Sequence, residues 1–330
     1  MVKKLQFYNN FKVSNKHKNS IILIGNFDGP HVGHQKLFDL AQKYKKKFKL
    51  KIGVITFEPM PKMYFNKSLK NFRISNLSQK VKNLETLNID FIIIKKFNKK
   101  FSKIKSKNFI QKILYKSLKA KYIFVSNNFR FGNKREGNVN QLKKNEKKFD
   151  YKTINPKPLV IKNKIISSTF IRKLISNGKI ENANKLLSRN WQIQSKVEKG
   201  RQLGKKIGFP TCNMSIKDYV IAKAGVYAVK IYKKNKKSFL KGIANLGYRP
   251  TFKQKKLLLE VHIFNYSGNL YNKYLTIEFI SFIRKEKKFK NINQLKKQIN
   301  LDIKITKKKT KLNNEQSKFK FTKNNIFDEG

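Results

Sequence analysis

The apolar pattern of this 330-residue chain changes its period once, close to Trp191. Before Trp191, apolar runs of strand length alternate with stretches in which apolar residues recur at helical spacing. Strands that alternate with helices indicate βαβ units and a parallel sheet. After Trp191, short β-type runs follow one another with turn residues between them, which favours a small antiparallel barrel. The sequence therefore predicts an α/β chain: a Rossmann-like N-terminal domain with a parallel sheet, then a small antiparallel β-barrel domain with a C-terminal helix.

The change of pattern predicts two domains, which suits a chain of 330 residues at roughly 150 residues per domain. We expect the first domain over residues 1–184 and the second over 185–303. Residues 304–330 are polar and aperiodic, so they are expected to form a basic and mostly disordered tail. Strands are expected over 20–25, 51–57, 90–94, 122–125, 225–232, 241–244, 257–264 and 275–282, and helices over 30–44, 78–87, 107–118 and 291–300.

The chain is strongly basic, with 78 Lys and Arg against 18 Asp and Glu, a formal charge of +60. The lysines are spread along the whole chain and come with abundant Asn, Ile and Phe, the residues of A/T-rich codons. One interpretation is therefore drift in genome composition, with lysines tolerated on solvated faces. The other is a surface that follows nucleic-acid phosphates, with a steep dependence of binding on salt. We favour the first interpretation and do not expect nucleic acid as a partner. Under either interpretation, the positive electrostatic field of the chain attracts anionic substrates such as nucleotides.

The expected location is the cytoplasm. The single cysteine, Cys212, excludes an intramolecular disulfide and a zinc site built from cysteines, and it fits a reducing compartment. The first 20 residues contain no apolar core of a signal peptide. No stretch approaches the ~18 apolar residues that span a bilayer, so no membrane partner is expected.

One segment of the first region joins a strand, a glycine turn and a helix start. The strand ends at Gly25, and Asp28-Gly29 is a typical turn pair. Pro30 suits the first helical position, which would place His31 and His34 on one face of the first turn. A helix N-terminus favours phosphate, and two imidazoles beside it can donate to phosphate oxygens as charge builds up. The candidate nucleotide-binding set here is Gly25, Asn26, Phe27, Asp28, Gly29, His31, Gly33 and His34.

Two other interpretations of the histidines stay open at this point. They can be ordinary residues near a helix start, or they can be a metal pair, although no carboxylate-rich or cysteine-containing ligand set accompanies them.

A second candidate segment is the cluster Ser167, Ser168 and Thr169 before a helix. Serines at such a place normally cap the helix. Arg172 is unusual near a helix start because a cation there opposes the helix dipole. A bound anion would relieve this conflict, so the segment is a candidate contact for a triphosphate.

The second region has its own candidates, in a glycine-containing loop before a short motif. Glycines let a loop close over phosphates, and neutral oxygens on Thr211 and Asn213 suit Mg²⁺ that is shared with phosphate. The alternative is a plain loop between two strands. The candidate set is Gly204, Gly208, Pro210, Thr211 and Asn213, with Thr211 and Asn213 as metal ligands. Glu260 lies between Leu259 and Val261, so strand alternation predicts that it faces the side opposite to them.

The segments GNFDGPHVGHQ and ISSTFIR resemble the two signatures of the nucleotidyltransferase superfamily, and in particular the adenylyltransferase domain of bacterial bifunctional riboflavin kinase/FAD synthetases. TFEP over 56–59 and NNFRFG over 127–132 resemble further motifs of that family. The second region, with GFPTCN over 208–213, resembles the riboflavin kinase domain of the same enzymes. Four positions depart from the family pattern, namely Met60, Ser126, Asn265 and Asn272.

This resemblance implies a bifunctional enzyme with riboflavin, FMN and ATP as substrates and Mg²⁺ as its metal. In the first domain it implies that His31 and His34 are catalytic and bind ATP phosphates. It also implies that Ser167, Ser168, Thr169 and Arg172 steady pyrophosphate, and that Asn128, Phe129 and Arg130 face the flavin. In the second domain it implies Glu260 as the catalytic base. The oligomeric state stays open.

Two alternatives remain from the sequence. One is a nucleotidyltransferase for another acceptor, such as a pantetheine or pyridine phosphate, against which the kinase-like barrel argues. The other is a basic protein that binds RNA or DNA.

Overall fold

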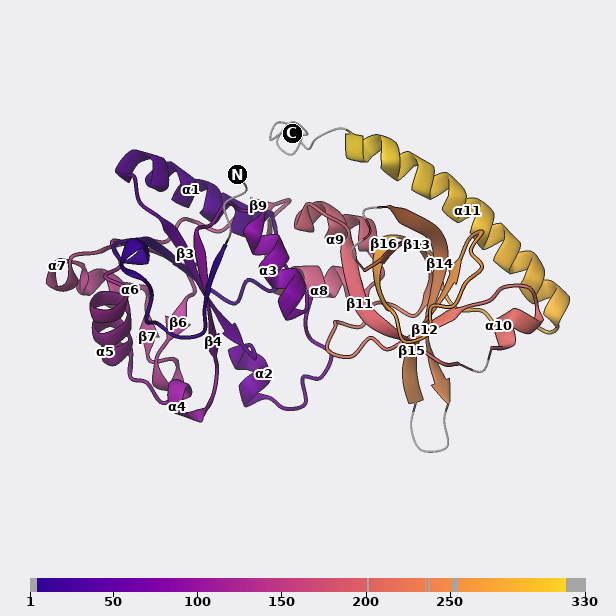
Figure 1. Cartoon of the computed structure of the whole chain (residues 1–330), viewed down its shortest axis with the longest axis horizontal. Coiled ribbons are helices and arrows are strands. Elements are labelled where there is room, and N and C mark those ends of the chain that lie inside the picture. The colour runs from indigo at the N-terminus through magenta and orange to yellow at the C-terminus, as the bar shows by residue number, and fades with distance from the viewer. Residues whose placement is uncertain (1–4, 201, 235, 237, 251–254, 319–330) are drawn as a thin grey trace. The chain divides into compact units, whose positions relative to one another are not determined.

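The computed structural model describes residues 5–200, 202–234, 236, 238–250 and 255–318. The chain forms two compact units, unit 1 over Met1–Phe170 and unit 2 over Ile171–Gly330 (Figure 1). This division lies before the domain boundary predicted after residue 184. The reason is helix α9 (Ile180–Leu187), which contacts the barrel strands of unit 2. In particular, the Asn184 side chain donates to the Phe279 carbonyl at 2.9 Å.

Unit 1 is built on a six-stranded sheet in which all strands are parallel, as predicted. In sheet order the strands are β1 (Gln6–Tyr8), β4 (Phe91–Lys96), β3 (Ile52–Glu58), β2 (Ile21–Ile24), β5 (Tyr122–Phe124) and β8 (Lys152–Ile154). The four central strands follow the predicted apolar runs. The edge strands β1 and β8 have three residues each and carry polar residues, so no apolar run of strand length predicted them.

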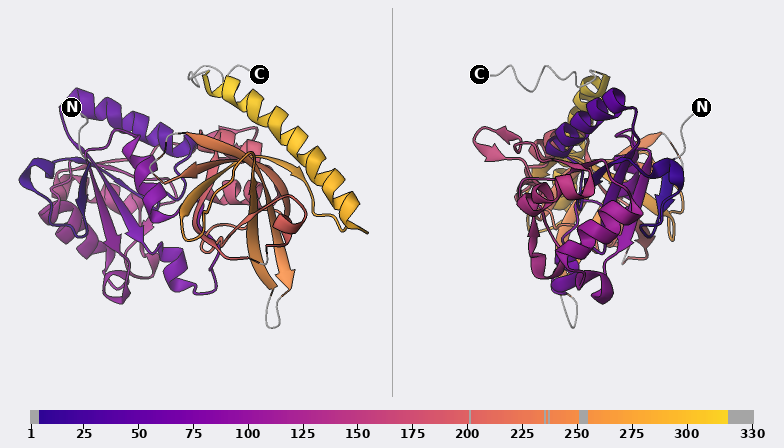
Figure 2. Two further views of the ribbon diagram at one scale, coloured as in Figure 1. Left: turned by 45° about the vertical axis from the view of Figure 1, so that its right-hand side comes forward. Right: turned by 90° about the vertical axis from the view of Figure 1, so that its left-hand side faces the viewer.

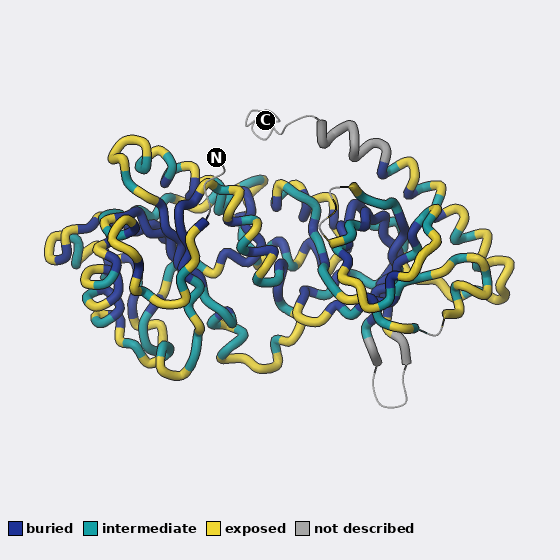
Figure 3. The backbone as a smooth tube through the Cα atoms, in the orientation of Figure 1, coloured by how far each residue is buried: buried dark blue, intermediate teal, exposed yellow. Residues whose placement is uncertain are grey.

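Helices cover both faces of this sheet, and Figure 3 shows the buried strands between them. One face packs against α1 (Val32–Phe48) and α3 (Leu77–Glu85), and its core includes Phe38 and Leu84. The other packs against η2 (Phe109–Ser117), wound as a π-helix, and α6 (Val139–Lys144). The remaining short elements are η1 (Asn15–His17), α2 (Pro61–Phe65), α4 (Lys99–Ser102), α5 (Ser106–Asn108), β6 (Arg130–Phe131), η3 (Asn133–Arg135), β7 (Gly137–Asn138), α7 (Glu146–Phe149), β9 (Val160–Ile161), β10 (Lys164–Ile165) and α8 (Ser168–Ser176).

Unit 2 is a closed antiparallel barrel, which confirms the predicted architecture. Around the barrel the strands are β11 (Trp191–Glu198), β12 (Cys212–Met214), β15 (Lys255–Ile263), β14 (Phe239–Pro250), β13 (Gly225–Lys233) and β16 (Tyr274–Arg284). Alternate apolar residues such as Ile193, Leu259 and Val261 are fully buried in the interior. Strands β11 and β12 were not predicted because polar residues interrupt their apolar pattern. Between β11 and β12 lies the short helix α10 (Leu203–Lys206).

A long C-terminal helix, α11 (Ile292–Lys318), runs along the barrel and contacts β13, β14 and β16 (Figure 2). The predicted disordered tail is therefore wrong for residues 304–318, while 319–330 lie outside the described residues. The prediction failed because the buried face of this helix is polar: Asp302, Thr306 and Thr310 recur at every fourth position and are at most 1% exposed. Arg284 on β16 anchors the helix, since its guanidinium donates to both carboxylate oxygens of Asp302 at 2.8–3.0 Å.

Candidate functional site

The first candidate site lies where strand order reverses in the sheet of unit 1. From β2 the chain continues to β3 on one side, whereas β5 lies on the other side of β2. In open parallel sheets, ligands bind outside the carboxyl ends of the strands at such a switch point. The loop after β2 holds the predicted histidine segment, and the loop after β5 holds the predicted flavin-side residues. The fold therefore brings these two segments to the same edge.

The loop after β2 has a special backbone conformation. Phe27 has a φ of 45° and Gly29 a φ of 61°. At Gly29 a side chain would also collide with Ile74, because its Cβ would lie 2.5 Å from the Ile74 Cγ2. The carboxylate of Asp28, which is 2% exposed, accepts from the backbone N–H groups of Ile74 and Ser75 at 3.0–3.2 Å. Buried acceptors of this kind fix a loop, because leaving them unpaired is costly.

The two histidines lie side by side at the start of α1. Their ring centroids are 3.8 Å apart, and the His31 N–H approaches His34 Nδ1 at 3.4 Å. His31 is the N-cap and His34 the third helical residue, so α1 begins at Val32 and Pro30 precedes the helix instead of opening it. The predicted juxtaposition of the histidines is nevertheless present. Phe27 supports the pair, with its ring 5.3 Å from that of His34.

The serine segment lies against the loop after β2. The Ser168 hydroxyl donates to the Asp28 carbonyl at 2.9 Å, and a Cβ on Gly33 would lie 3.4 Å from the Ile166 carbonyl oxygen. The Ser167 hydroxyl accepts from the Phe170 N–H at 3.2 Å, which is the capping role expected of such a serine. The two signatures of the first domain therefore meet in space, although they are far apart in sequence.

Two members of this segment are placed differently from Ser167 and Ser168. Thr169 is exposed. Arg172 follows Ser168 by four residues in α8, so it lies in the second turn rather than near the first N–H groups, and it belongs to unit 2. Its predicted role at the pyrophosphate stays a prediction.

The flavin-side residues follow β5 directly. Asn128 and Arg130 are exposed, and the Asn128 Oδ1 accepts from the Ser126 hydroxyl at 2.9 Å. Phe129 is half-buried, with its ring stacked on Phe131 at 5.5 Å. An exposed amide and an exposed guanidinium next to an aromatic ring can receive a flat ligand with polar edges.

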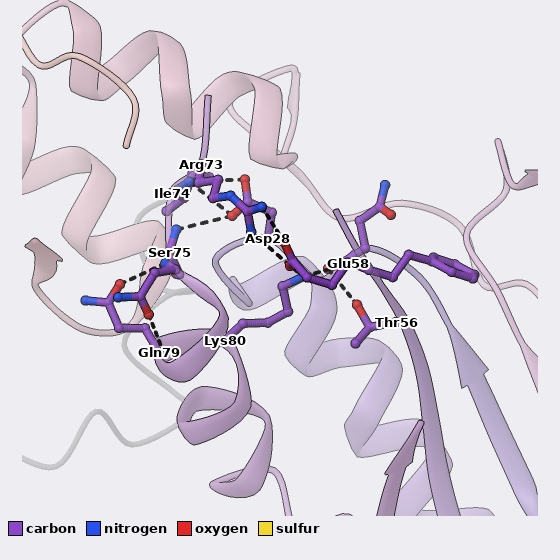
Figure 4. A network of polar contacts seen from close by, with 11 residues as sticks. Asp28, Thr56, Glu58, Arg73, Ile74, Ser75, Gln79 and Lys80 are labelled. Atoms are coloured by element: carbon purple, nitrogen blue, oxygen red, sulfur yellow. Dashed lines mark hydrogen bonds and ion pairs between the residues drawn. The ribbon is translucent and has the colours of Figure 1, made fainter. Parts of the chain in front are cut away.

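Sequence reasoning missed a buried polar network beneath the loop after β2 (Figure 4). Glu58, at the end of β3, forms an ion pair with Arg73, and the Lys80 ammonium lies 3.9 Å from the same carboxylate. Burial lowers the pKa of Lys80, while the carboxylates of Glu58 and Asp28 oppose this shift. Thr56 also joins β3 to the loop, because its hydroxyl donates to the Asn26 carbonyl at 3.1 Å. The only signal in the sequence was the TFEP motif that contains Glu58.

The second candidate site is a row of polar residues across the outer face of the barrel in unit 2. Glu198 on β11 pairs with Asn213 on β12, Asn213 pairs with Glu260 on β15, and Glu260 pairs with Asn245 on β14. Directly opposed residues on neighbouring strands have Cβ atoms about 5 Å apart and point to the same face. Leu259 and Val261 are 0% exposed, so Glu260 faces outward as the alternation predicted. Glu198 was not among the predicted site residues, because its place opposite Asn213 depends on the register between β11 and β12.

The glycine-containing loop between β11 and β12 covers this row. A Cβ on Gly200 would lie 1.9 Å from the Asn213 Nδ2, and one on Gly204 would lie 2.3 Å from the Phe209 carbonyl oxygen. Gly208 has a φ of 90° with open space beside it. The loop therefore needs these glycines for close approach and for its turn.

Two further residues of the predicted set lie at the end of this loop. The Pro210 carbonyl lies 2.9 Å from the His262 Nδ1, which holds the end of the loop to β15. Thr211 is half-buried, and its hydroxyl oxygen would lie 3.4 Å from a Cβ on Gly204.

Comparison with known proteins assigns each unit to a family. The sequence model for FAD synthetase matches residues 13–170, and that for riboflavin kinase matches residues 187–310. A bifunctional riboflavin kinase/FMN adenylyltransferase of Buchnera aphidicola subsp. Schizaphis graminum is 42% identical over 88% of this chain and 94% of its own length. The Escherichia coli K12 protein of the same name is 33% identical over 86% of this chain and 90% of its own length.

A solved structure is similar over most of the chain. A Streptococcus pneumoniae protein described as a macrolide-efflux protein has a TM-score of 0.81 and 28% identity, over 91% of this chain and 98% of its own. In the described part of the present chain, none of the helices combines the length and the apolar character needed to cross a bilayer. From its two matched domains and its relatives, the chain belongs to the bifunctional riboflavin kinase/FMN adenylyltransferase family.

Proposed function

We propose that this chain makes flavin cofactors in two steps. It phosphorylates riboflavin with ATP to give FMN, and it then transfers AMP from a second ATP to FMN, which gives FAD and pyrophosphate. The observation that carries this proposal is that each of the two compact units matches one of the two enzyme families. Riboflavin, FMN and ATP are thus the expected partners, and the cytoplasm, where these are available, is the expected location.

In unit 1, a phosphate oxygen of FMN attacks the α-phosphorus of ATP, and the bond to the leaving pyrophosphate breaks. No protein nucleophile is needed, so catalysis consists of positioning and charge stabilisation. The neighbouring His31 and His34 donate to phosphate oxygens at the N-terminus of α1, where the backbone N–H groups and the helix dipole also favour anions. Asn128, Phe129 and Arg130 receive the flavin part of FMN.

The serine segment has two roles in this proposal. Ser167 and Ser168 hold the loop and the start of α8 through the hydrogen bonds described above, and their N–H groups and that of Thr169 face the pyrophosphate. Arg172 neutralises its charge. The capping role and the anion-binding role are compatible, because a capped helix N-terminus still presents its remaining N–H groups.

In unit 2, the ribityl 5′-hydroxyl of riboflavin attacks the γ-phosphorus of ATP, and ADP leaves. Glu260 accepts the proton of the attacking hydroxyl. The loop with Gly204, Gly208 and Pro210 closes over the phosphates. Glu260 lies directly across from Asn213, so the base and the proposed metal ligand share one face of the barrel.

Thr211 and Asn213 would hold Mg²⁺ in this unit. These residues fit the ion because the Asn213 Oδ1 is buried and has no hydrogen-bond partner in the described ranges of the chain. A hydroxyl oxygen beside substrate phosphates is also one of the Mg²⁺ ligands in P-loop NTPases. When bound, the ion supplies positive charge at the phosphates.

The test is a turnover assay that resolves both products. Wild-type protein with riboflavin, ATP and Mg²⁺ should yield FMN and then FAD. The double variant His31→Ala/His34→Ala should stop at FMN, with adenylylation reduced about 100-fold or more. Glu260→Gln should lose FMN formation by about 100-fold or more and still adenylylate supplied FMN.

Matched controls are His17→Gln in unit 1 and Glu181→Gln in unit 2. His17 is a buried histidine outside the site, and Glu181 is an exposed glutamate that pairs with Lys309. Both should keep both activities. Full-rate FAD synthesis by the histidine variant would refute the assignment of the first site. Adenylylation of a pantetheine or pyridine phosphate in place of FMN would refute the proposal that FMN is the acceptor.

A further inference from the structure

Four charged side chains from four separate segments form a cluster beneath the loop after β2, in which three are buried and Glu58 is partly exposed (Figure 4). Asp28 comes from that loop, Glu58 from the end of β3, Arg73 from the loop before α3, and Lys80 from α3 itself. Asp28 is 2% exposed, Arg73 8% and Lys80 0%. Two carboxylates and two cations give the cluster a formal charge of zero.

The contacts within this cluster are specific. The Arg73 Nη1 donates to the Glu58 Oε2 at 2.9 Å, and its Nη2 donates to the other carboxylate oxygen. The Lys80 ammonium lies 3.9 Å from the Glu58 Oε2 and 3.5 Å from the Phe57 carbonyl oxygen. Lys80 therefore sits where the backbone of β3 and the carboxylate of Glu58 meet.

The same cluster is connected by hydrogen bonds to the loop after β2, which is proposed to bind phosphate. Asp28 accepts from the N–H groups of Ile74 and Ser75, which directly follow Arg73. Three residues after Asp28 comes His31, the first of the paired histidines. Asp28, which these hydrogen bonds hold in place, is thus joined to the histidines by a short stretch of backbone.

Buried ion pairs contribute little stability compared with well-packed apolar side chains, because desolvation of the charges offsets their attraction. A lysine without exposed surface is therefore poorly explained by stability alone. Its neighbours are carboxylates next to a loop that is proposed to receive a triphosphate. Without the Lys80 ammonium, the cluster would carry a net negative charge beneath the place where phosphates bind.

We propose that Lys80 is a positioning residue of the adenylyl-transfer site. Its ammonium balances the carboxylates of Glu58 and Asp28. This keeps the loop after β2 in its conformation and prevents a net negative charge that would repel the phosphates of ATP. Lys80 has no direct contact with substrate in this role. The inference rests on the proposed adenylyl transfer in unit 1 and goes beyond it, because it assigns a role in ATP affinity to a residue of α3.

The test measures steady-state kinetics of the full-length protein with supplied FMN and Mg-ATP. Lys80→Met should raise the KM for ATP about tenfold and change the KM for FMN less than about twofold. Riboflavin phosphorylation by the same protein should keep its kinetic constants, which shows that the variant is folded in unit 2.

A charge-matched double variant separates electrostatics from packing. Lys80→Met/Glu58→Gln leaves one carboxylate and one cation, so the cluster is again neutral. It should recover the KM for ATP to within about threefold of the wild-type value. If Lys80 acted only through packing, the KM for ATP should be at least as high in the double variant as in the single one, because the double variant has lost more contacts.

The matched control is Lys45→Met. The Lys45 ammonium pairs with the buried carboxylate of Asp90 at 2.7 Å in the same unit, away from the loop after β2. Its loss should lower the melting temperature and leave the KM for ATP unchanged.

Three results would overturn the inference: an unchanged KM for ATP in Lys80→Met, an equal rise in Lys45→Met, or a double variant no better than the single one. If the wild-type protein made no FAD at all, the proposed function would fail instead, so the two failures are distinguishable.

Discussion

At the scale of single residues, Cys212 is a measurable reporter of the kinase site. It lies on β12 between Thr211 and Asn213, and burial raises the pKa of its thiol. Because the thiolate is the reactive form, iodoacetamide should alkylate Cys212 more slowly than a free cysteine at pH 8. The rate should keep rising with pH beyond the point at which that of a free cysteine levels off, because burial raises the pKa of the Cys212 thiol.

Mass spectrometry of the intact chain measures this reaction without ambiguity, since Cys212 is the single cysteine. Cys212→Ser should take up no label. A rate that levels off below pH 8.5 would contradict the raised pKa.

Residues of the site differ in how far the sequence could predict them. His31 and His34 could be paired from the sequence because three local features, a strand end, a glycine turn and a helix start, fixed their spacing. Arg73 and Lys80 could not be linked to Asp28 and Glu58 in the same way. Their partners are set by how α3 packs on the sheet, and no local pattern encodes such a contact.

At the scale of elements, α11 gives the clearest test. The Asp302 carboxylate is buried and accepts from Arg284 and from Gln298. Asp302→Ala leaves the Arg284 guanidinium without its carboxylate, so the free energy of unfolding of unit 2 should fall by about 3 kcal/mol. Urea unfolding followed by Trp191 fluorescence measures this, because the only tryptophan of the chain is buried in the barrel.

The control on the same helix face is Thr306→Val. The Thr306 hydroxyl is buried and has no hydrogen-bond partner within the described part of the chain. Its replacement by a methyl group should therefore leave stability unchanged or raise it by about 1 kcal/mol. If Thr306→Val lowered the free energy of unfolding as much as Asp302→Ala, any change on this helix face would be destabilising, and the ion pair would contribute no more than the other contacts there.

The helices and strands that were predicted are those whose apolar pattern is not interrupted by polar residues. The strands β2, β3 and β4 are buried on both faces and read as continuous apolar runs. In contrast, β11 combines buried apolar residues with partly buried polar ones, and the buried face of α11 consists of polar side chains. Their burial depends on partners from distant strands, so the sequence pattern alone could not reveal it.

At the scale of the whole molecule, the two compact units predict two separable activities. The histidine double variant is expected to lack adenylylation and still form FMN, and Glu260→Gln is expected to have the reverse defect. A mixture of both proteins with riboflavin, ATP and Mg²⁺ should therefore make FAD, because FMN released by one protein can be used by the other. The FAD yield over time, measured by chromatography, checks this expectation.

Each variant alone serves as the control and should give no FAD from riboflavin. If the mixture also gave none, although each variant kept its remaining activity, FMN would have to pass to the second site within one chain.

The order of the two domains was predictable because each carries its own motif set. The compact units divide before residue 184, because α9 (Ile180–Leu187) packs on the barrel strands β11 and β16. The charge of +60 was fully visible in the sequence, yet its purpose depends on where the lysines lie in space.

The closure of the barrel has a consequence for how this protein is made. Trp191 pairs with Phe279, so the first strand of the barrel is sealed by the last. On the ribosome, the sheet of unit 1 can form before the barrel is synthesised, because the two described core clusters on its faces contain no residue after Ile154. The barrel must wait with an open edge at β11 until β16 is synthesised. During that interval β11 can pair with β12 on one side, while its other edge, which β16 covers in the finished barrel, stays open; this is the stage at which a chaperone would protect the chain most.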